Sequence, residues 1–157
     1  MLARSPRVLI VLSLTLILAG VAGAGEKNTD PEAVLGLWET EHEPDGYSRV
    51  EIVRDGDEFT GNIVWLSIPV YAENDPDGEA GTPILDTENP DESLRDRPLL
   101  GLLLLHSFRF DKGDGKWVDG RVYDPVAGKE YRCKLTLKDA DTLEVYGYIK
   151  VGFVKMG

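Results

Sequence analysis

Four side chains that suit ligand binding lie close together in the chain: Asp86, Asn89, Arg95 and Arg97. Arginine presents a planar fork of N–H donors that fits carboxylates and phosphates. The cluster therefore predicts a ligand-facing rim, on condition that at least one guanidinium points into a cavity. The alternative is structural. In that case the four side chains hold their own segment together, and the arginines pair with Asp91, Glu92 or Asp96.

His106 and Tyr123 complete the candidate ligand-binding set. The alternation of residues 102–110 places His106 on one strand face with Leu104, Phe108 and Phe110. If that face is internal, burial favours the neutral imidazole, either as a ligand contact or as a hydrogen-bonded core histidine. We predict no catalytic residue, because the adjacent Ser107 is expected on the opposite strand face and leaves His106 without a nucleophile.

Metal and cofactor chemistry finds little support in the composition. The chain has two histidines and one cysteine, Cys133, which do not make a structural zinc site. Residues 73–78 are similar to the start of a calcium-binding loop, but the twelfth position is Ile84 and not glutamate. Cys133 alternates with Leu135, which predicts a buried, inert thiol and leaves no internal disulfide. We predict no metal and no cofactor.

The elements that must position these side chains are short strands. Apolar and polar residues alternate in seven segments separated by Gly-, Pro- and Asp-rich turns, namely 36–40, 48–54, 58–66, 102–110, 116–123, 131–137 and 143–149. An eighth strand is expected at 152–156. Sequential hairpins favour an up-and-down meander, and closing the meander on itself removes exposed edges. We therefore predict an all-β chain that forms a small antiparallel up-and-down β-barrel.

A long loop interrupts the strands at residues 67–98. It contains five prolines and many acids, and its apolar residues follow no regular period. Within it, Asn89 is expected as an N-cap and Pro90 as the first helical residue, giving one short helical turn over 91–95 that Pro98 ends. We predict that the loop closes one end of the barrel, either as a plug or as the rim of a ligand site.

The first 24 residues predict a signal peptide. Arg4 and Arg7 give a basic start, residues 8–19 are apolar or small, and Ala22-Gly23-Ala24 is a cleavage site. The apolar run is shorter than the roughly 20 residues that span a bilayer. We expect cleavage near Ala24, one domain over residues 25–157 and no stable membrane span after cleavage.

The net charge restricts the partners. It is −11 for the full chain, and removing the two signal-peptide arginines makes the domain more acidic still. Phosphate backbones and anionic lipid surfaces repel such a protein, so we exclude nucleic acid as a partner. Sugars, cations, small apolar molecules and basic protein surfaces remain open.

Seven motifs occur in a familiar order: Gly36-Leu37-Trp38, Gly61-Asn62-Ile63-Val64, Asp86-x-x-Asn89-Pro90, Arg95-x-Arg97-Pro98-Leu99-x-Gly101, Trp117-x-x-Gly120-x-Val122-Tyr123-Asp124-Pro125, Gly128-Lys129-x-Tyr131 and Leu143-x-Val145-x-Gly147-Tyr148. Together they resemble the exported bacterial family catalogued as domain of unknown function 2147. The resemblance covers essentially the whole mature chain. It implies a small periplasmic, lipocalin-like barrel with no established activity, so it carries over no catalytic residue.

Two departures from the family pattern stand out. Members often have a cysteine pair around the second hairpin, where this chain has Asp55 and Thr60. Members also tend to end in a strand with Trp-x-Arg, whose arginine in lipocalin-like barrels stacks on the tryptophan of the first strand, here Trp38. This chain ends at Gly157 without that motif. We expect either a truncated C-terminal strand or a weakened barrel bottom.

Three functions follow from these observations. The first is a periplasmic barrel that binds a small apolar or amphipathic molecule, with residues 86–100 forming or covering its mouth. The second is an envelope structural or interaction protein with a filled barrel and an acidic surface for a basic partner. The third is a hydrolase. An internal cavity favours the first and a packed interior the second. An acid and a nucleophile within about 3 Å of His106, beside a cleft, favour the third.

Overall fold

The structure is a computed structural model that describes residues 27–148 except 43 and 45. The predicted signal peptide and the predicted strand at 152–156 lie outside the described residues. Seven strands follow in order: β1 (Gly36–Glu39), β2 (Ser48–Asp55), β3 (Glu58–Leu66), β4 (Leu103–Asp111), β5 (Lys116–Asp124), β6 (Lys129–Asp139) and β7 (Thr142–Tyr148). Two single turns of 3-10 helix accompany them, η1 (Pro31–Val34) and η2 (Glu92–Leu94).

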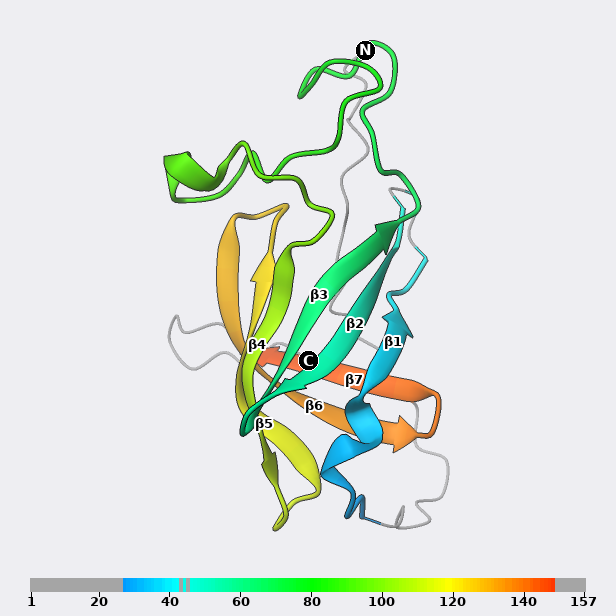
Figure 1. The fold of residues 1–157 in the computed structure, drawn as a ribbon, viewed down its shortest axis with the longest axis vertical. Coiled ribbons are helices and arrows are strands. Elements are labelled where there is room, and N and C mark those ends of the chain that lie inside the picture. The colour runs from blue at the N-terminus through cyan, green and yellow to red at the C-terminus, as the bar shows by residue number, and fades with distance from the viewer. Residues whose placement is uncertain (1–26, 43, 45, 149–157) are drawn as a thin grey trace.

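Every strand pairs antiparallel with its neighbour in the chain, so the sheet order is β1-β2-β3-β4-β5-β6-β7. This confirms the predicted all-β, antiparallel, up-and-down architecture. Figure 1 shows the sheet curled into a half-barrel, and β1 and β7 are its two end strands in the described part of the chain. No helix among residues 27–148 is both long and apolar enough to cross a membrane.

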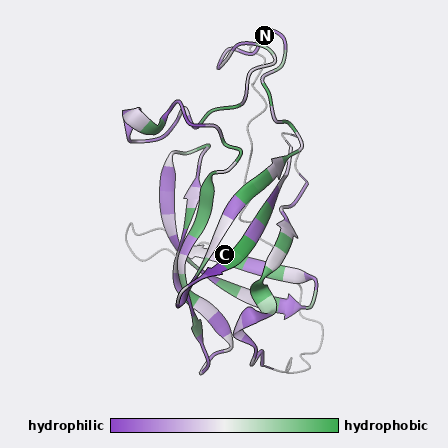
Figure 2. Ribbon diagram, in the orientation of Figure 1, coloured by the Kyte–Doolittle hydropathy of each residue, from purple (hydrophilic) through white to green (hydrophobic). Residues whose placement is uncertain are grey.

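The inner face of the curled sheet is packed with large apolar side chains. Hydrophobic and hydrophilic residues alternate along the strands in Figure 2. Cys133 and Leu135 are buried and Tyr131 and Leu137 pack against the same core, as their alternation predicts. The Trp117 ring lies in the middle of this core, with its centroid 5.2 Å from that of Phe110. The interior is therefore filled around Trp117.

The turn η1 covers one end of this core. Asp30 caps it by accepting the Glu32 N–H at 2.9 Å, and Val34 is fully buried. Two indole groups donate to its backbone: Trp117 Nε1 to Pro31 O at 3.0 Å, and Trp38 Nε1 to Val34 O at 2.7 Å. Trp117, which lies far along the chain, and Trp38 thus hold this short turn against the sheet.

Irregularities in β4 turn His106 away from the core. Leu105 pairs with the buried Val122, whereas His106 pairs with Arg121 on the outer face. Ser107 then adopts a φ of +62°, and Phe108 faces inward again. An irregular residue of this kind shifts the alternation by one position. The prediction that His106 shares a face with Phe108 and Phe110 is therefore wrong.

The long loop extends over residues 67–102 and lies beyond the ends of β3 and β4 (Figure 1). Its buried apolar residues, Tyr71, Ile84, Leu99 and Leu102, belong to the same hydrophobic cluster as the sheet. The predicted helical turn is shorter than expected. Its N-cap is Asp91, which accepts the Ser93 N–H, and not Asn89. Asn89 Oδ1 instead accepts the Asp91 N–H, while its Nδ2 donates to Asp86 and to Tyr123.

Candidate functional site

A buried polar network joins the long loop to β5. Asp86 has no exposed surface, and four donors reach its carboxylate. The Tyr123 hydroxyl donates to Oδ1 at 2.7 Å. Asn89 Nδ2 donates to Oδ2 at 2.8 Å, and Nε and Nη2 of Arg97 each lie 2.9 Å from the same oxygen. Asn89 Nδ2 also donates to the Tyr123 hydroxyl at 3.1 Å.

Local backbone structure brings these groups together. The Asp86 N–H donates to the Arg97 carbonyl at 3.0 Å, which folds the loop back on itself. Tyr123 precedes the turn between β5 and β6 and pairs with Glu130 across it. Gly128 ends that turn with a φ of +60°, and a Cβ there would overlap the Glu88 carbonyl. The glycine thus lets the hairpin pass directly beneath the loop.

The network fixes the protonation of Tyr123. Burial, followed by the hydrogen bond to Asp86 and its negative charge, raises the pKa of the Tyr123 hydroxyl well above its usual value. The hydroxyl therefore keeps its proton and remains a donor to Asp86. Because Asp86, Asn89 and Tyr123 satisfy one another, they serve chiefly to hold the loop on the sheet.

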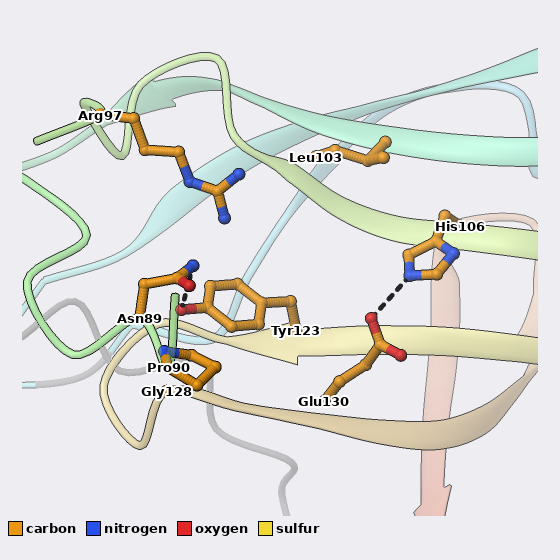
Figure 3. A pocket seen from close by; sticks show the side chains of 8 residues that line it. All are labelled: Asn89, Pro90, Arg97, Leu103, His106, Tyr123, Gly128 and Glu130. Atoms are coloured by element: carbon orange, nitrogen blue, oxygen red, sulfur yellow. Dashed lines mark hydrogen bonds and ion pairs between the residues drawn. The ribbon is translucent and has the colours of Figure 1, made fainter. Parts of the chain in front are cut away.

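A hollow of about 390 Å³ lies beside this network. Eight residues line it (Figure 3): Asn89, Pro90, Arg97, Leu103, His106, Tyr123, Gly128 and Glu130. We call it the outer hollow, because His106 and Leu103 lie on the outer face of β4. A ligand site inside the barrel or at its mouth was expected, and the outer hollow is not in that place.

His106 lies at the end of the outer hollow away from Arg97 (Figure 3). Its Nε2 is 2.8 Å from Glu130 Oε2, and its Nδ1 is 3.0 Å from Ser107 Oγ. The prediction that Ser107 points to the opposite face from His106 is wrong, because its left-handed backbone returns the hydroxyl to the imidazole. Arg121 Nη1 lies 3.6 Å from the second oxygen of Glu130.

Comparison with known proteins places the chain in a family. The family model described as "Uncharacterized protein conserved in bacteria (DUF2147)" matches residues 36–156. The chain belongs to this family. The resemblance seen in the seven sequence motifs is therefore confirmed.

The chain is also similar in fold to a solved structure. It is described as "Protein HP1028 from the human pathogen Helicobacter pylori belongs to the lipocalin family". The two superpose with a TM-score of 0.58 at 22% identity, over 78% of this chain and 77% of the other. This likeness shows a lipocalin-like fold. No curated protein matches the chain.

The structure of this family member sorts the candidate residues into three groups. Asp86, Asn89, Arg97 and Tyr123 form one network, whereas His106 lies apart from it in the same hollow. Arg95 does not line the hollow. Its Nε donates to the Asn89 carbonyl at 2.7 Å, and its Nη1 is 3.7 Å from Glu92, so it braces the loop.

Ser107 and Glu130 were not among the candidates. Glu130 could have been found from the sequence, because the turn at 124–128 sets the hairpin register that pairs Glu130 with Tyr123. Ser107 carries no comparable signal, because its position depends on a left-handed backbone that serine rarely adopts.

The remaining candidate, the Cys133 thiol, is not placed to react. Cys133 is buried, and burial raises the pKa of its thiol to about 12, so it stays protonated and unreactive. Among residues 27–148 other than 43 and 45, no three His, Cys, Asp or Glu side chains come together as a metal site would require.

Proposed function

We propose that this protein binds a small amphipathic molecule in the outer hollow. The lipocalin-like fold is consistent with such a role, and the position of Arg97 carries the proposal. Its guanidinium is anchored on the buried Asp86 through Nε and Nη2. Its Nη1 has no partner among the described residues, and Arg97 lines the hollow.

The walls of the hollow suit a molecule with one polar and one apolar end. A fixed guanidinium favours a ligand oxygen, since little side-chain entropy is lost when it binds. Leu103 is 43% exposed and Pro90 is exposed, and both line the hollow. Covering these surfaces with an apolar group removes them from water, which contributes about 25 cal/mol per Å².

Native mass spectrometry of the protein recovered from a bacterial periplasm tests this proposal. We expect an additional small-molecule mass on the wild type that is absent from Arg97→Ala. Arg109→Ala is the matched control, because Arg109 pairs with Glu58 and does not line the hollow. Repeated recovery with nothing bound, or equal retention by Arg97→Ala, would overturn the proposal.

We also propose that the protein is exported to the periplasm. The basic start, the apolar run at 8–19 and the cleavage site at 22–24 support this. Cell fractionation with intact-mass measurement tests it. We expect a periplasmic species that begins near Gly25, and an unprocessed cytoplasmic chain would contradict the proposal.

The filled interior favours a second candidate, an envelope protein that docks a basic partner. The long loop exposes several acids: Glu88, Asp91, Glu92 and Asp96 are among them. Cross-linking in intact cells tests this candidate. A partner that is captured by the wild type and lost when these four acids are changed to Asn or Gln would support it, whereas capture that persists would oppose it.

A further inference from the structure

We propose that Ser107, His106 and Glu130 form a hydrolytic site for small carboxylic esters. This inference rests on the proposed binding of a ligand in the outer hollow. Ser107 Oγ lies 3.0 Å from one imidazole nitrogen of His106, and Glu130 Oε2 lies 2.8 Å from the other. A hydroxyl, an imidazole and a carboxylate in sequence are the arrangement of nucleophile, base and orienting acid. His106 and Glu130 line the outer hollow, and the Ser107 hydroxyl lies behind that lining, in contact with His106.

The backbone of Ser107 is the second observation. In a regular strand, consecutive side chains point to opposite faces, so Ser107 and His106 would not meet. A φ of +62° brings them together. Serine is disfavoured in this region, and residues held there cluster at functional sites. The strained position therefore coincides with a hydroxyl that contacts His106.

Glu130 is itself held in place. One of its oxygens faces His106 Nε2, and Arg121 Nη1 lies 3.6 Å from the other. An imidazole whose Nε2–H donates to Glu130 presents Nδ1 as the acceptor toward Ser107. Glu130 is thus a positioning residue that selects the tautomer needed to accept the serine proton, and Arg121 anchors its carboxylate.

The reaction balances with water as the second substrate. Ser107 Oγ attacks the ester carbonyl carbon, and its proton passes to His106 Nδ1. The ester C–O bond breaks, and the departing alcohol takes that proton, which leaves an acyl group on Ser107. Water then gives a proton to His106 Nδ1 and attacks the acyl carbon. Ser107 leaves with the proton, and the carboxylic acid is released.

Hydrolysis of p-nitrophenyl acetate by the purified protein tests this inference. General-base catalysis contributes about 10²–10⁴-fold, so we expect a measurable but modest rate. Intact mass and peptide mapping should locate one acetyl group on Ser107 during turnover.

Ser107→Gly is the decisive variant, because glycine suits the left-handed backbone and leaves the fold intact. We expect at least about a 100-fold loss of rate, with a circular dichroism spectrum like that of the wild type. Ser93→Gly is the matched control: Ser93 lies in η2, and its hydroxyl donates to Asp91 Oδ1 at 2.7 Å and not to His106. Glu130→Gln should lower kcat with little change in KM, which a merely structural role would not produce.

A wild-type rate in Ser107→Gly, or acetylation at another residue, would overturn the inference. Its failure is separable from failure of the binding proposal. A ligand whose retention depends on Arg97, bound to a protein without esterase activity, would leave binding intact and remove only the hydrolytic site. Loss of both would remove the hollow as a site altogether.

Discussion

Trp117 and Asp86 are both fully buried, but different interactions stabilise them in their buried positions. Trp117 lies on the inner face of the sheet, where many aromatic and aliphatic side chains pack against it. Asp86 sits between the long loop and the outer end of β5, where three particular side chains satisfy its charge. The inner face is thus specified by a pattern that many sequences satisfy. The outer network depends on individual partners.

The largest predicted effect tests the inner face. Trp117→Ala should lower the free energy of unfolding by about 3–5 kcal/mol, because it removes the largest buried side chain and leaves a cavity. The loss is measured by urea unfolding. Trp65→Ala is the control, since Trp65 is 37% exposed and has the Arg49 guanidinium over its ring. We expect the control to lose about 1 kcal/mol, and equal losses would contradict the contrast between the two faces.

The next effect tests the outer network. Asp86→Ala should destabilise the protein by about 2–3 kcal/mol, because Tyr123 and Asn89 lose an acceptor in a buried place. Arg97 is 37% exposed and recovers part of its hydration. Asp96→Ala, at an exposed position of the same loop, should change stability by less than about 0.5 kcal/mol. Thermal unfolding of both variants checks the difference, and similar melting temperatures would show that the network does not anchor the loop.

Most of the fold follows from sequence pattern. Alternation identifies the strands, and Gly- and Asp-rich turns separate them, because one sheet face must be apolar and each reversal needs special backbone angles. Two features escape this reasoning. Ser107 and Asp119 both have a positive φ and interrupt the alternation, although neither is glycine. The capping of η2 also escapes it, because the helical turn begins two residues later than expected and Asp91, not Asn89, is its N-cap.

The candidate site was predictable only in part. Arginine, acid and amide side chains in one segment indicate a polar cluster, but not whether it satisfies itself or faces a cavity. That distinction depends on Tyr123, which lies far along the chain and reaches Asp86 through the curl of the sheet. Sequence spacing within the loop cannot show such a contact.

Tyr123→Phe tests how the Tyr123 hydroxyl contributes to the outer network as the pH rises. At neutral pH we expect a loss of about 1 kcal/mol, the value of one hydrogen bond. Because the folded-state pKa of Tyr123 is raised, its contribution is complete below the ordinary tyrosine pKa of about 10 and decreases as the pH rises above that value. Urea unfolding from pH 8 to 11 should show wild type and variant converging. A constant difference would mean that Asp86 does not hold the Tyr123 proton.

The smallest effect concerns Ser107 and has the opposite sign. Ser107→Gly should stabilise the protein by about 0.5–1 kcal/mol, because glycine adopts a φ of +62° without strain. Asp119→Gly, at a φ of +61° in β5, provides a matched position without a contact to His106. If both variants gain equally, the serine hydroxyl adds little stability, and the strained serine beside His106 is explained by the proposed hydrolytic role. If Ser107→Gly is less stable than the wild type, the hydrogen bond to His106 outweighs the strain, and Ser107 has a structural reason to be there.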